Sequence, residues 1–217
     1  MAALQISSEM LDIKERFPTL EIYAGLEQFT LLKNSDASTI YGYAANYMAE
    51  GADKIYLYNW YMNPNSDNTL RVEMFSNCAS SEKLLEEAKR YVVTYQDIWP
   101  AGSKQYKPLP MAFYRNTSLK LGTGKVKESA EAYVYISVDP NCIHDMGENT
   151  LTITVDGVKC DYLGTASAPG NDYSGQTLYK YKVNAELSQN TRHTLEFLHD
   201  DDSTVIVLTY IELSVMN

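Results

Sequence analysis

The sequence has few cysteines, no surplus of basic residues and no long apolar run, and each absence excludes a class of protein. Cys78, Cys142 and Cys160 are an odd number without metal-ligand spacing, so neither a disulfide framework nor a cysteine-rich zinc site is expected. The 217 residues include 18 Lys and Arg against 28 Asp and Glu, a net charge of −10. That charge argues against a nucleic-acid-binding protein, because contact with phosphates needs a basic surface.

No apolar run approaches the length of about 18 residues that a membrane-spanning helix needs. The first residues, MAALQISSEMLDIKERF, show no basic segment followed by an apolar one, so no signal peptide is expected. His144, His193 and His199 lack the spacing of a zinc site, and the last two are expected on a sheet surface. We therefore expect no metal, cofactor, nucleic acid or membrane partner.

Tyrosine is the abundant residue, with 18 copies, and 45% of the residues are hydrophobic. This hydrophobic share is too high for a disordered chain and sufficient for a folded core. Tyrosine rings with a polar tip suit surfaces that contact carbohydrate or protein. They suit β-sheets equally well, so both interpretations stay open.

Residues 1–99 alternate helical and strand patterns. Apolar side chains at positions 6, 10, 13 and 17 predict a short helix, capped by Ser7 and stopped by Pro18. LEIYAGL at 20–26 and KIYLYNW at 54–60 are continuous apolar runs of strand length, and a helical pattern over 40–48 lies between them. This order predicts two parallel strands that are buried on both faces, as in a (β/α) barrel. A last helix is predicted over 84–92, capped by Ser80 or Ser81.

Residues 111–217 have the alternation and turn signals of antiparallel strands. Strands are predicted at 131–138, 150–155, 158–164, 178–185, 194–199 and 204–215, and Asp156-Gly157 predicts a tight hairpin. The stretch PAGSKQYKPLP at 100–110 has three prolines and reads as a linker. The sequence thus predicts α/β plus all-β: a partial parallel (β/α)-barrel-like segment over 1–99, a linker, and an antiparallel, jelly-roll-like β-sandwich over 111–217.

Two parallel strands alone leave both sheet edges open and bury too little apolar surface to stand alone. Three solutions are consistent with the sequence. The chain is the remainder of a longer protein, or it associates with further copies or a completing chain, or the sandwich and the last helix cover the strands.

Three stretches, EIYAGLEQF, ASTIYGYAANYMAEGADKIYLYNWY and KRYVVTYQDIW before the Pro-rich joint, favour the first solution. Together, over about residues 20–110, they resemble the C-terminal part of a family of bacterial glycoside-hydrolase-like (β/α)8 proteins with a C-terminal β-sandwich. The sandwich matches that family only in its general pattern, and everything upstream in the barrel is missing. The resemblance implies an extracytoplasmic location if a leader preceded this sequence, and otherwise the location is cytoplasmic.

The resemblance also implies a candidate site at the carboxyl ends of the two parallel strands, where (β/α)8 enzymes hold their catalytic groups. Glu27 lies where barrel glycosidases often place a nucleophilic carboxylate; the alternative is a solvated or salt-bridged strand end. Trp60 and Tyr61 are candidates for stacking on sugar rings, or for core packing. Gln28 and Asn59 are candidates for hydrogen bonds to a sugar, and a turn contact is the alternative for Asn59.

Glycoside hydrolysis usually needs a second carboxylate, and in the related barrels an earlier strand supplies it. The sequence therefore predicts a glycoside-hydrolase-related fragment that recognises a polysaccharide or oligosaccharide without hydrolysing it on its own. A second hypothesis is a carbohydrate-binding module that works through sandwich loops, with Tyr162 and Tyr173 in the segment CDYLGTASAPGNDYSG. A third is a structural domain whose tyrosines contact protein.

Overall fold

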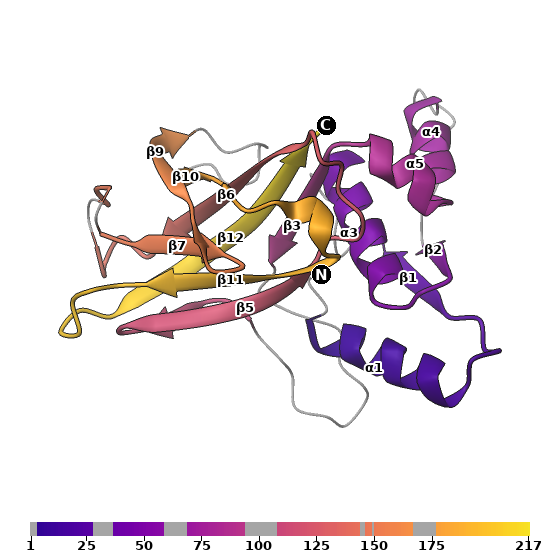
Figure 1. Ribbon diagram of the computed structural model, residues 1–217, viewed down its shortest axis with the longest axis horizontal. Helices are drawn as coiled ribbons and strands as arrows, with labels where there is room; N and C mark the ends of the chain where they lie inside the picture. The colour runs from indigo at the N-terminus through magenta and orange to yellow at the C-terminus, as the bar shows by residue number, and fades with distance from the viewer. Residues whose placement is uncertain are drawn as a thin grey trace.

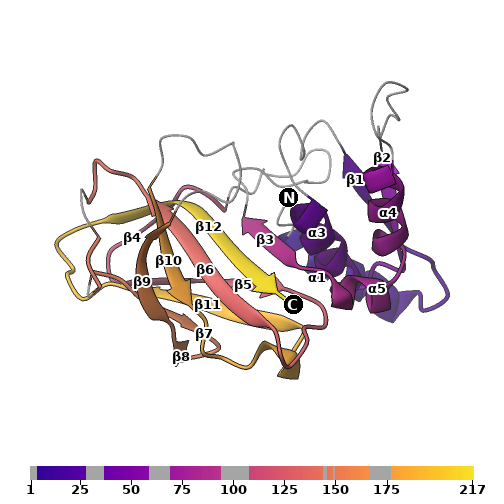
Figure 2. The same ribbon diagram turned by 90° about the horizontal axis from the view of Figure 1, so that it is seen from above.

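The computed structural model describes residues 4–27, 37–58, 69–93, 108–143, 146–148, 150–166 and 177–217. Figures 1 and 2 show two parts, a β-sandwich and a smaller α/β part, with helix α3 (Ala37–Ala49) between them. The described helices include none that is long and apolar enough to cross a membrane.

The α/β part follows the predicted βαβ order. Besides α3, its elements are α1 (Leu4–Arg16), β1 (Tyr23–Glu27), β2 (Lys54–Tyr58), α4 (Thr69–Cys78) and α5 (Ser81–Glu86). Strands β1 and β2 pair in parallel, as predicted, in a sheet of two strands. The parallel pair and the helix between its strands are therefore confirmed, whereas the described residues show no more of a barrel than this.

Two helix predictions need correction. Helix α1 begins at Leu4, so Ser7 lies inside it and does not cap it. The helix predicted over 84–92 ends at Glu86, although Ser80 does cap its start by accepting a hydrogen bond from the backbone N of Lys83 at 3.1 Å. The chain then forms strand β3 (Lys89–Val93), because pairing with the last strand outweighs a helical apolar spacing.

The sandwich consists of two antiparallel sheets. The order in one sheet is β3-β12-β6-β10-β9, with β4 also paired to β12, and the order in the other is β5-β11-β7-β8. Their bounds are β4 (Met111–Phe113), β5 (Asn116–Gly122), β6 (Glu131–Val138), β7 (Thr152–Val155), β8 (Val158–Lys159), β9 (Asp161–Ala166), β10 (Leu178–Lys182), β11 (Arg192–Leu198) and β12 (Ile206–Met216). Most of the predicted antiparallel strands are confirmed, but the strand predicted at 158–164 is two strands, β8 and β9, which belong to different sheets. Strands β3, β4 and β5 were not predicted. One short 3-10 helix, Leu187–Gln189, precedes β11.

The predicted hairpin forms at Asp156 and Gly157, between β7 and β8. Both residues have positive φ, 50° and 78°, as a two-residue hairpin with the twist of its strands requires. The core lies between the two sheets, where side chains such as Val134, Ile136 and Phe197 are fully buried. Along β11 burial has period two, so that His193, Leu195 and Phe197 face this core.

Helix α3 lies along the free edge of β3 and is buried on all sides over residues 39–47. A Cβ atom at Gly42 would lie only 2.7 Å from the carbonyl carbon of Arg90, so the helix and strand backbones are in contact. The hydroxyl of Tyr43 donates to the carbonyl of Val92 at 3.4 Å. The helix therefore covers a sheet edge that would otherwise be open to pairing.

The same helix also reaches the second sheet. The amide of Asn46 donates to the carbonyl of Gly122 at 2.7 Å, and Glu50 forms an ion pair with Arg192. A Cβ at Gly122 would lie 2.9 Å from the amide nitrogen of Asn46, so a side chain here would displace the polar ends of Asn46 and Glu50. Thus α3 is anchored to both sheets, while the division of the chain near residues 100–110 stays a prediction.

Candidate functional site

The predicted site centres on the ends of β1 and β2. Glu27 is the last residue of β1, and its backbone lies opposite Tyr58, the last residue of β2. The other candidates at this edge are Gln28, Asn59, Trp60 and Tyr61, and they lie outside the described residues, as does Tyr173 of the sandwich loop. The catalytic and binding roles assigned to these residues stay predictions.

Tyr162 is half-buried in β9. Its hydroxyl donates to the carbonyl of Met146 at 2.9 Å, and its ring centroid lies 5.2 Å from that of Tyr181 in a tilted pair. Both contacts hold strand β9 and the nearby chain in place, so at least part of this ring serves the fold. Its role in ligand binding stays a prediction.

The face of the β1–β2 sheet that carries Tyr23 and Tyr56 is exposed. Tyr23 and Tyr56 are 53% and 55% exposed, and Gly25, directly opposite Tyr56 in the register, has nothing within 4 Å of where its Cβ would be. On the opposite face Ala24 and Leu26 are buried. The prediction that both faces are buried is therefore wrong, because the described residues provide a covering layer on one side of the two strands only.

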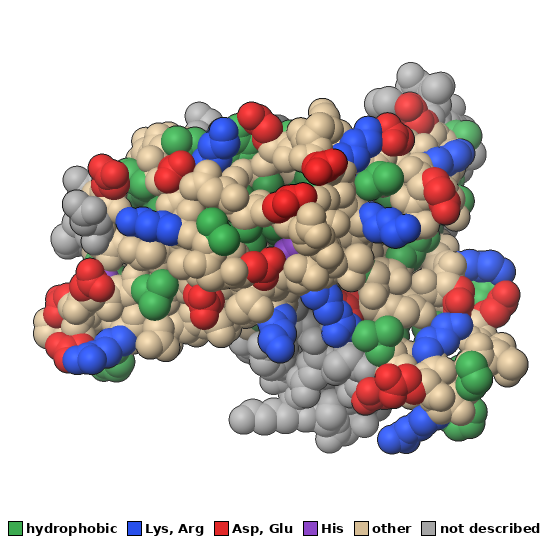
Figure 3. Space-filling view, viewed as in Figure 1, with side chains coloured by type: hydrophobic (Ala, Val, Ile, Leu, Met, Phe, Trp, Pro, Cys, Tyr) green, Lys and Arg blue, Asp and Glu red, His purple; other side chains and the backbone are tan. Residues whose placement is uncertain are grey.

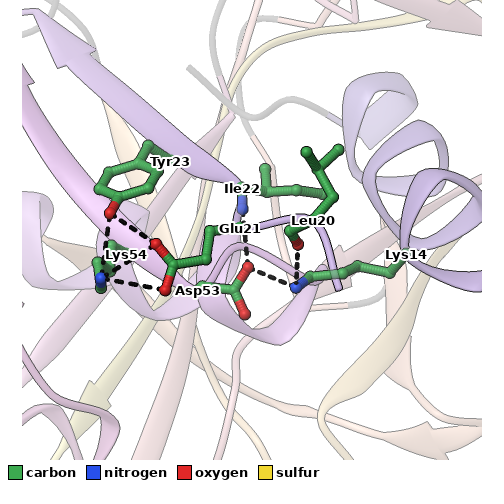
Figure 4. Close-up of polar contacts among 7 residues, drawn as sticks. All are labelled: Lys14, Leu20, Glu21, Ile22, Tyr23, Asp53 and Lys54. Carbon is green, nitrogen blue, oxygen red and sulfur yellow. Dashed lines mark hydrogen bonds and ion pairs between the residues drawn. The ribbon is translucent and has the colours of Figure 1, made fainter. Parts of the chain in front are cut away.

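A polar cluster lies beside Tyr23 at the start of the strands (Figure 4). The ammonium of Lys54 lies 3.3 Å from a carboxylate oxygen of Glu21 and donates to the hydroxyl of Tyr23 at 3.0 Å; that hydroxyl donates to Glu21 at 2.9 Å. These hydrogen bonds lower the pKa of Glu21, with Tyr23 contributing most, and they raise the pKa of Lys54. Both groups therefore stay charged near neutral pH.

Asp53 and Lys14 form a second pair in the same cluster. The ammonium of Lys14 lies 2.5 Å from a carboxylate oxygen of Asp53 and donates to the carbonyl of Leu20 at 2.7 Å. The same carboxylate accepts a hydrogen bond from the backbone N–H of Ile22 at 2.8 Å. Both hydrogen bonds lower the pKa of Asp53, and the one from Lys14 has the larger effect. Figure 4 shows that this pair ties α1 to the starts of β1 and β2.

Glu21 and Asp53 cannot replace the missing acid of a glycosidase. Both lie just before their strands, at the amino ends, whereas Glu27 lies at the carboxyl end of β1. A general acid needs a raised pKa so that it carries a proton at neutral pH, and here both carboxyl pKa values are lowered. The cluster can offer hydrogen bonds and fixed charges but not proton transfer.

His193 is not on a sheet surface, contrary to prediction. Its side chain is fully buried in β11, in phase with Leu195 and Phe197, and Nδ1 lies 2.6 Å from a carboxylate oxygen of Asp156. His199 follows the end of the same strand and is partly buried. In the described part of the chain, no group of three or more His, Cys, Asp or Glu side chains is placed to hold a metal ion.

A pocket of about 440 Å³ lies between the end of α3, the start of α5 and the chain near Gly124. Its described walls carry small or aliphatic side chains, such as Ala45, Ala49 and Leu84, with Ser80 and Lys125 among its polar groups. None of these lining residues is aromatic, so the pocket offers no ring on which a sugar could stack.

Exposure of Tyr23 and Tyr56 was not predicted, because both strands have the pattern of continuous apolar runs. A period-two signal was present, since in β2 Lys54 and Tyr56 alternate with Ile55 and Leu57. Alternation of polar or amphipathic with aliphatic side chains is typical of a strand with one covered face. This signal would have indicated the exposed face.

No family model matches the sequence, and no curated protein matches it. Similar solved structures include two crystal structures of BuGH86 in complex with neoagarooctaose, one of the wild type and one of a variant. Their TM-scores are both 0.35, with sequence identities of 12% and 13%. Each match covers 61% of this chain, and the chain spans 20% of the BuGH86 chain.

Proposed function

We propose that this chain recognises a carbohydrate and does not hydrolyse it on its own. The observation that carries the proposal is the exposed pair Tyr23 and Tyr56 on adjacent strands, with the open position of Gly25 directly opposite Tyr56. Flat tyrosine faces suit the apolar C–H faces of sugar rings, and their hydroxyls hydrogen-bond to sugar hydroxyls. Glu21 and Lys54 add an acceptor and a donor at one end of this surface.

The lack of hydrolysis follows from the carboxylates that are present. Hydrolysis with two carboxylates needs them on opposite sides of the scissile bond, about 5 to 10 Å apart. Glu27 is the single candidate that the resemblance assigns, and Glu21 and Asp53 lie at the opposite ends of the strands with lowered pKa values. We propose that a completing chain or a longer polypeptide would have to supply the second carboxylate.

The α/β part is then a remnant of a (β/α)8 barrel, and the sandwich is a jelly-roll-like accessory domain. This ancestry is supported by the parallel pairing of β1 with β2 around α3. Two parallel strands with open edges also favour self-association or a completing chain. Light scattering of the purified chain at several concentrations tests for self-association. A monomer at every concentration would show that the two-stranded sheet does not pair with further copies.

The binding proposal is tested with Tyr56→Ala and Tyr23→Ala against a panel of oligosaccharides that includes neoagarooctaose. Calorimetry should show binding by the wild type and a loss of about fivefold or more in each variant, since an aromatic contact contributes about 1 kcal/mol or more. Tyr114→Ala is the matched control, because Tyr114 is 59% exposed but follows β4 in the sandwich.

Two results would count against the proposal. Binding that is reduced equally by Tyr114→Ala would show that the β1–β2 face is not the site, and an absence of binding to the whole panel would favour the protein-contact hypothesis. For the inherited position, Glu27→Gln should weaken glycan binding. Unchanged binding and unchanged hydrolysis would remove Glu27 from the site.

A further inference from the structure

We infer that the Tyr23–Tyr56 surface selects uncharged oligosaccharides of at least two sugar rings and discriminates against sulfated or uronic-acid chains. The inference rests on the proposed function and adds a substrate class to it. It follows from how the charges beside the tyrosines are paired and from the separation of Tyr23 and Tyr56 in the strand register.

The lysines at this edge are already paired with carboxylates. Lys54 contacts both carboxylate oxygens of Glu21, at 3.3 and 3.4 Å, and its ammonium lies 5.1 Å from the centre of the Tyr23 ring. Lys14 lies 2.5 Å from Asp53. An anionic sugar would therefore meet cations whose charge is compensated, together with the Glu21 carboxylate 2.9 Å from the Tyr23 hydroxyl.

The charge of the whole chain acts in the same direction. A net charge of −10 repels polyanions over the range of the Debye length, which is about 10 Å at 0.1 M salt. On the face of the molecule that Figure 3 shows, acidic and basic side chains are interspersed. An uncharged sugar is not repelled in this way and can still form hydrogen bonds with Glu21, Lys54 and Tyr23.

The spacing of the tyrosines sets a minimum length for the ligand. Tyr23 lies opposite Lys54 in the register, so Tyr56 is one strand across and two residues further along. With about 4.8 Å between strands and about 3.3 Å per residue, the two Cα atoms lie roughly 8 Å apart. A single pyranose ring is shorter than this span, so contact with both tyrosines needs neighbouring rings of one chain.

The test compares an uncharged galactan tetrasaccharide with a sulfated galactan tetrasaccharide, and with the galactose monosaccharide, by calorimetry at about 20 mM and about 500 mM NaCl. We expect the uncharged tetrasaccharide to bind with an affinity that changes less than twofold with salt, and the other two ligands to bind at least tenfold more weakly. Glu21→Gln removes the carboxylate that pairs with Lys54, so it should raise the affinity for the sulfated ligand relative to that for the uncharged ligand roughly two- to fivefold at low salt.

Glu131→Gln is the matched control. Glu131 also accepts a hydrogen bond from a tyrosine two residues on, Tyr133 at 2.8 Å, and lies 4.0 Å from Lys182, but on the sandwich. It changes the net charge equally and should alter neither affinity. Stronger binding of the sulfated ligand by the wild type, or an equal gain in Glu131→Gln, would overturn the inference while leaving carbohydrate binding intact. A lack of binding to all ligands would overturn both proposals.

Discussion

The strands on the two sides of α3 differ in how much of their surface the rest of the described chain covers. On the sandwich side, the edge of β3 is covered by backbone contact at Gly42 and by a hydrogen bond from Tyr43. On the other side, the β1–β2 sheet leaves Tyr23 and Tyr56 exposed. Covered edges contribute to stability, whereas an exposed aromatic face is available to a ligand or partner. The comparison therefore separates the part of the molecule that holds the fold from the part that we propose to bind.

Their polar groups differ in the same way. Arg90 and Glu212 form a buried ion pair with two contacts of 2.8 Å, and Tyr210 and Ser214 also hydrogen-bond to the Glu212 carboxylate. The pair Lys54 and Glu21 is more than half exposed. Breaking a buried pair leaves an unpaired charge in the interior, whereas water screens an exposed one.

The largest expected effect comes from breaking the buried pair. Glu212→Ala leaves the guanidinium of Arg90 without its carboxylate, and we expect a loss of about 3–5 kcal/mol in the free energy of unfolding, measured with urea. The double variant Arg90→Met with Glu212→Leu should recover much of this loss, because no buried charge remains. A loss in Glu212→Ala no larger than that in Glu21→Ala would contradict the contrast between the two regions.

The next effect tests the contact between α3 and β3. A methyl group at Gly42 would collide with the Arg90 carbonyl, so Gly42→Ala should destabilise the fold by about 3 kcal/mol in urea unfolding. Gly25→Ala serves as the control, since nothing lies within 4 Å of its Cβ position, and should cost less than about 0.5 kcal/mol. If both variants unfolded alike, α3 would not cover the edge of β3 as described.

A smaller effect concerns pH and the buried Lys89, whose ammonium donates to the carbonyls of Leu84 and Glu87 at 2.7 Å each. Burial lowers the pKa of Lys89 from 10.5 to about 8. Between these two pH values the unfolded chain keeps this proton while the folded chain has released it, so Lys89 makes stability rise with pH in that window.

Lys89→Met isolates this contribution from other groups that titrate at high pH. The difference in the free energy of unfolding between wild type and variant should shift in favour of the wild type from pH 8 to 10.5. The raised pKa values of Cys78 and Cys160 act in the opposite direction above pH 9, but they are common to both proteins. A difference that is flat across this window would show that Lys89 is not a buried cation.

The smallest effect is the order in which the thiols react with a disulfide reagent. Burial raises the pKa of Cys78 to about 12 and that of Cys160 to about 11, while Cys142 is partly exposed and should react first. Cys78 lies at the end of α4, in the α/β part, and Cys160 lies between β8 and β9. If the α/β part opens more readily than the sandwich, Cys78 reacts before Cys160. The reverse order would show that the sandwich opens more readily near Cys160 than the α/β part does near Cys78.

Local pattern was sufficient where strands or helices had one covered face or a distinctive turn. The period-two alternation of β6 and the Asp156-Gly157 turn gave correct strand and hairpin predictions. Pattern failed at β3, because Leu84, Tyr91 and Val92 have a helical spacing while the last two residues pair with β12. Pairing with a strand over a hundred residues away is invisible in a local window.

The sequence by itself determined the parallel pair around α3 and most strands of the antiparallel second half, because periodicity, caps and turn residues act over a few neighbours. Only the tertiary structure decided that α3 completes the sandwich edge and that Tyr23 and Tyr56 are exposed. The close approach of α3 at Gly124, where a Cβ would lie 3.1 Å from the carbonyl oxygen of Ala45, is likewise visible only in the folded chain. Exposure and close contact depend on which surfaces distant segments bring together, and that is a property of the packed chain.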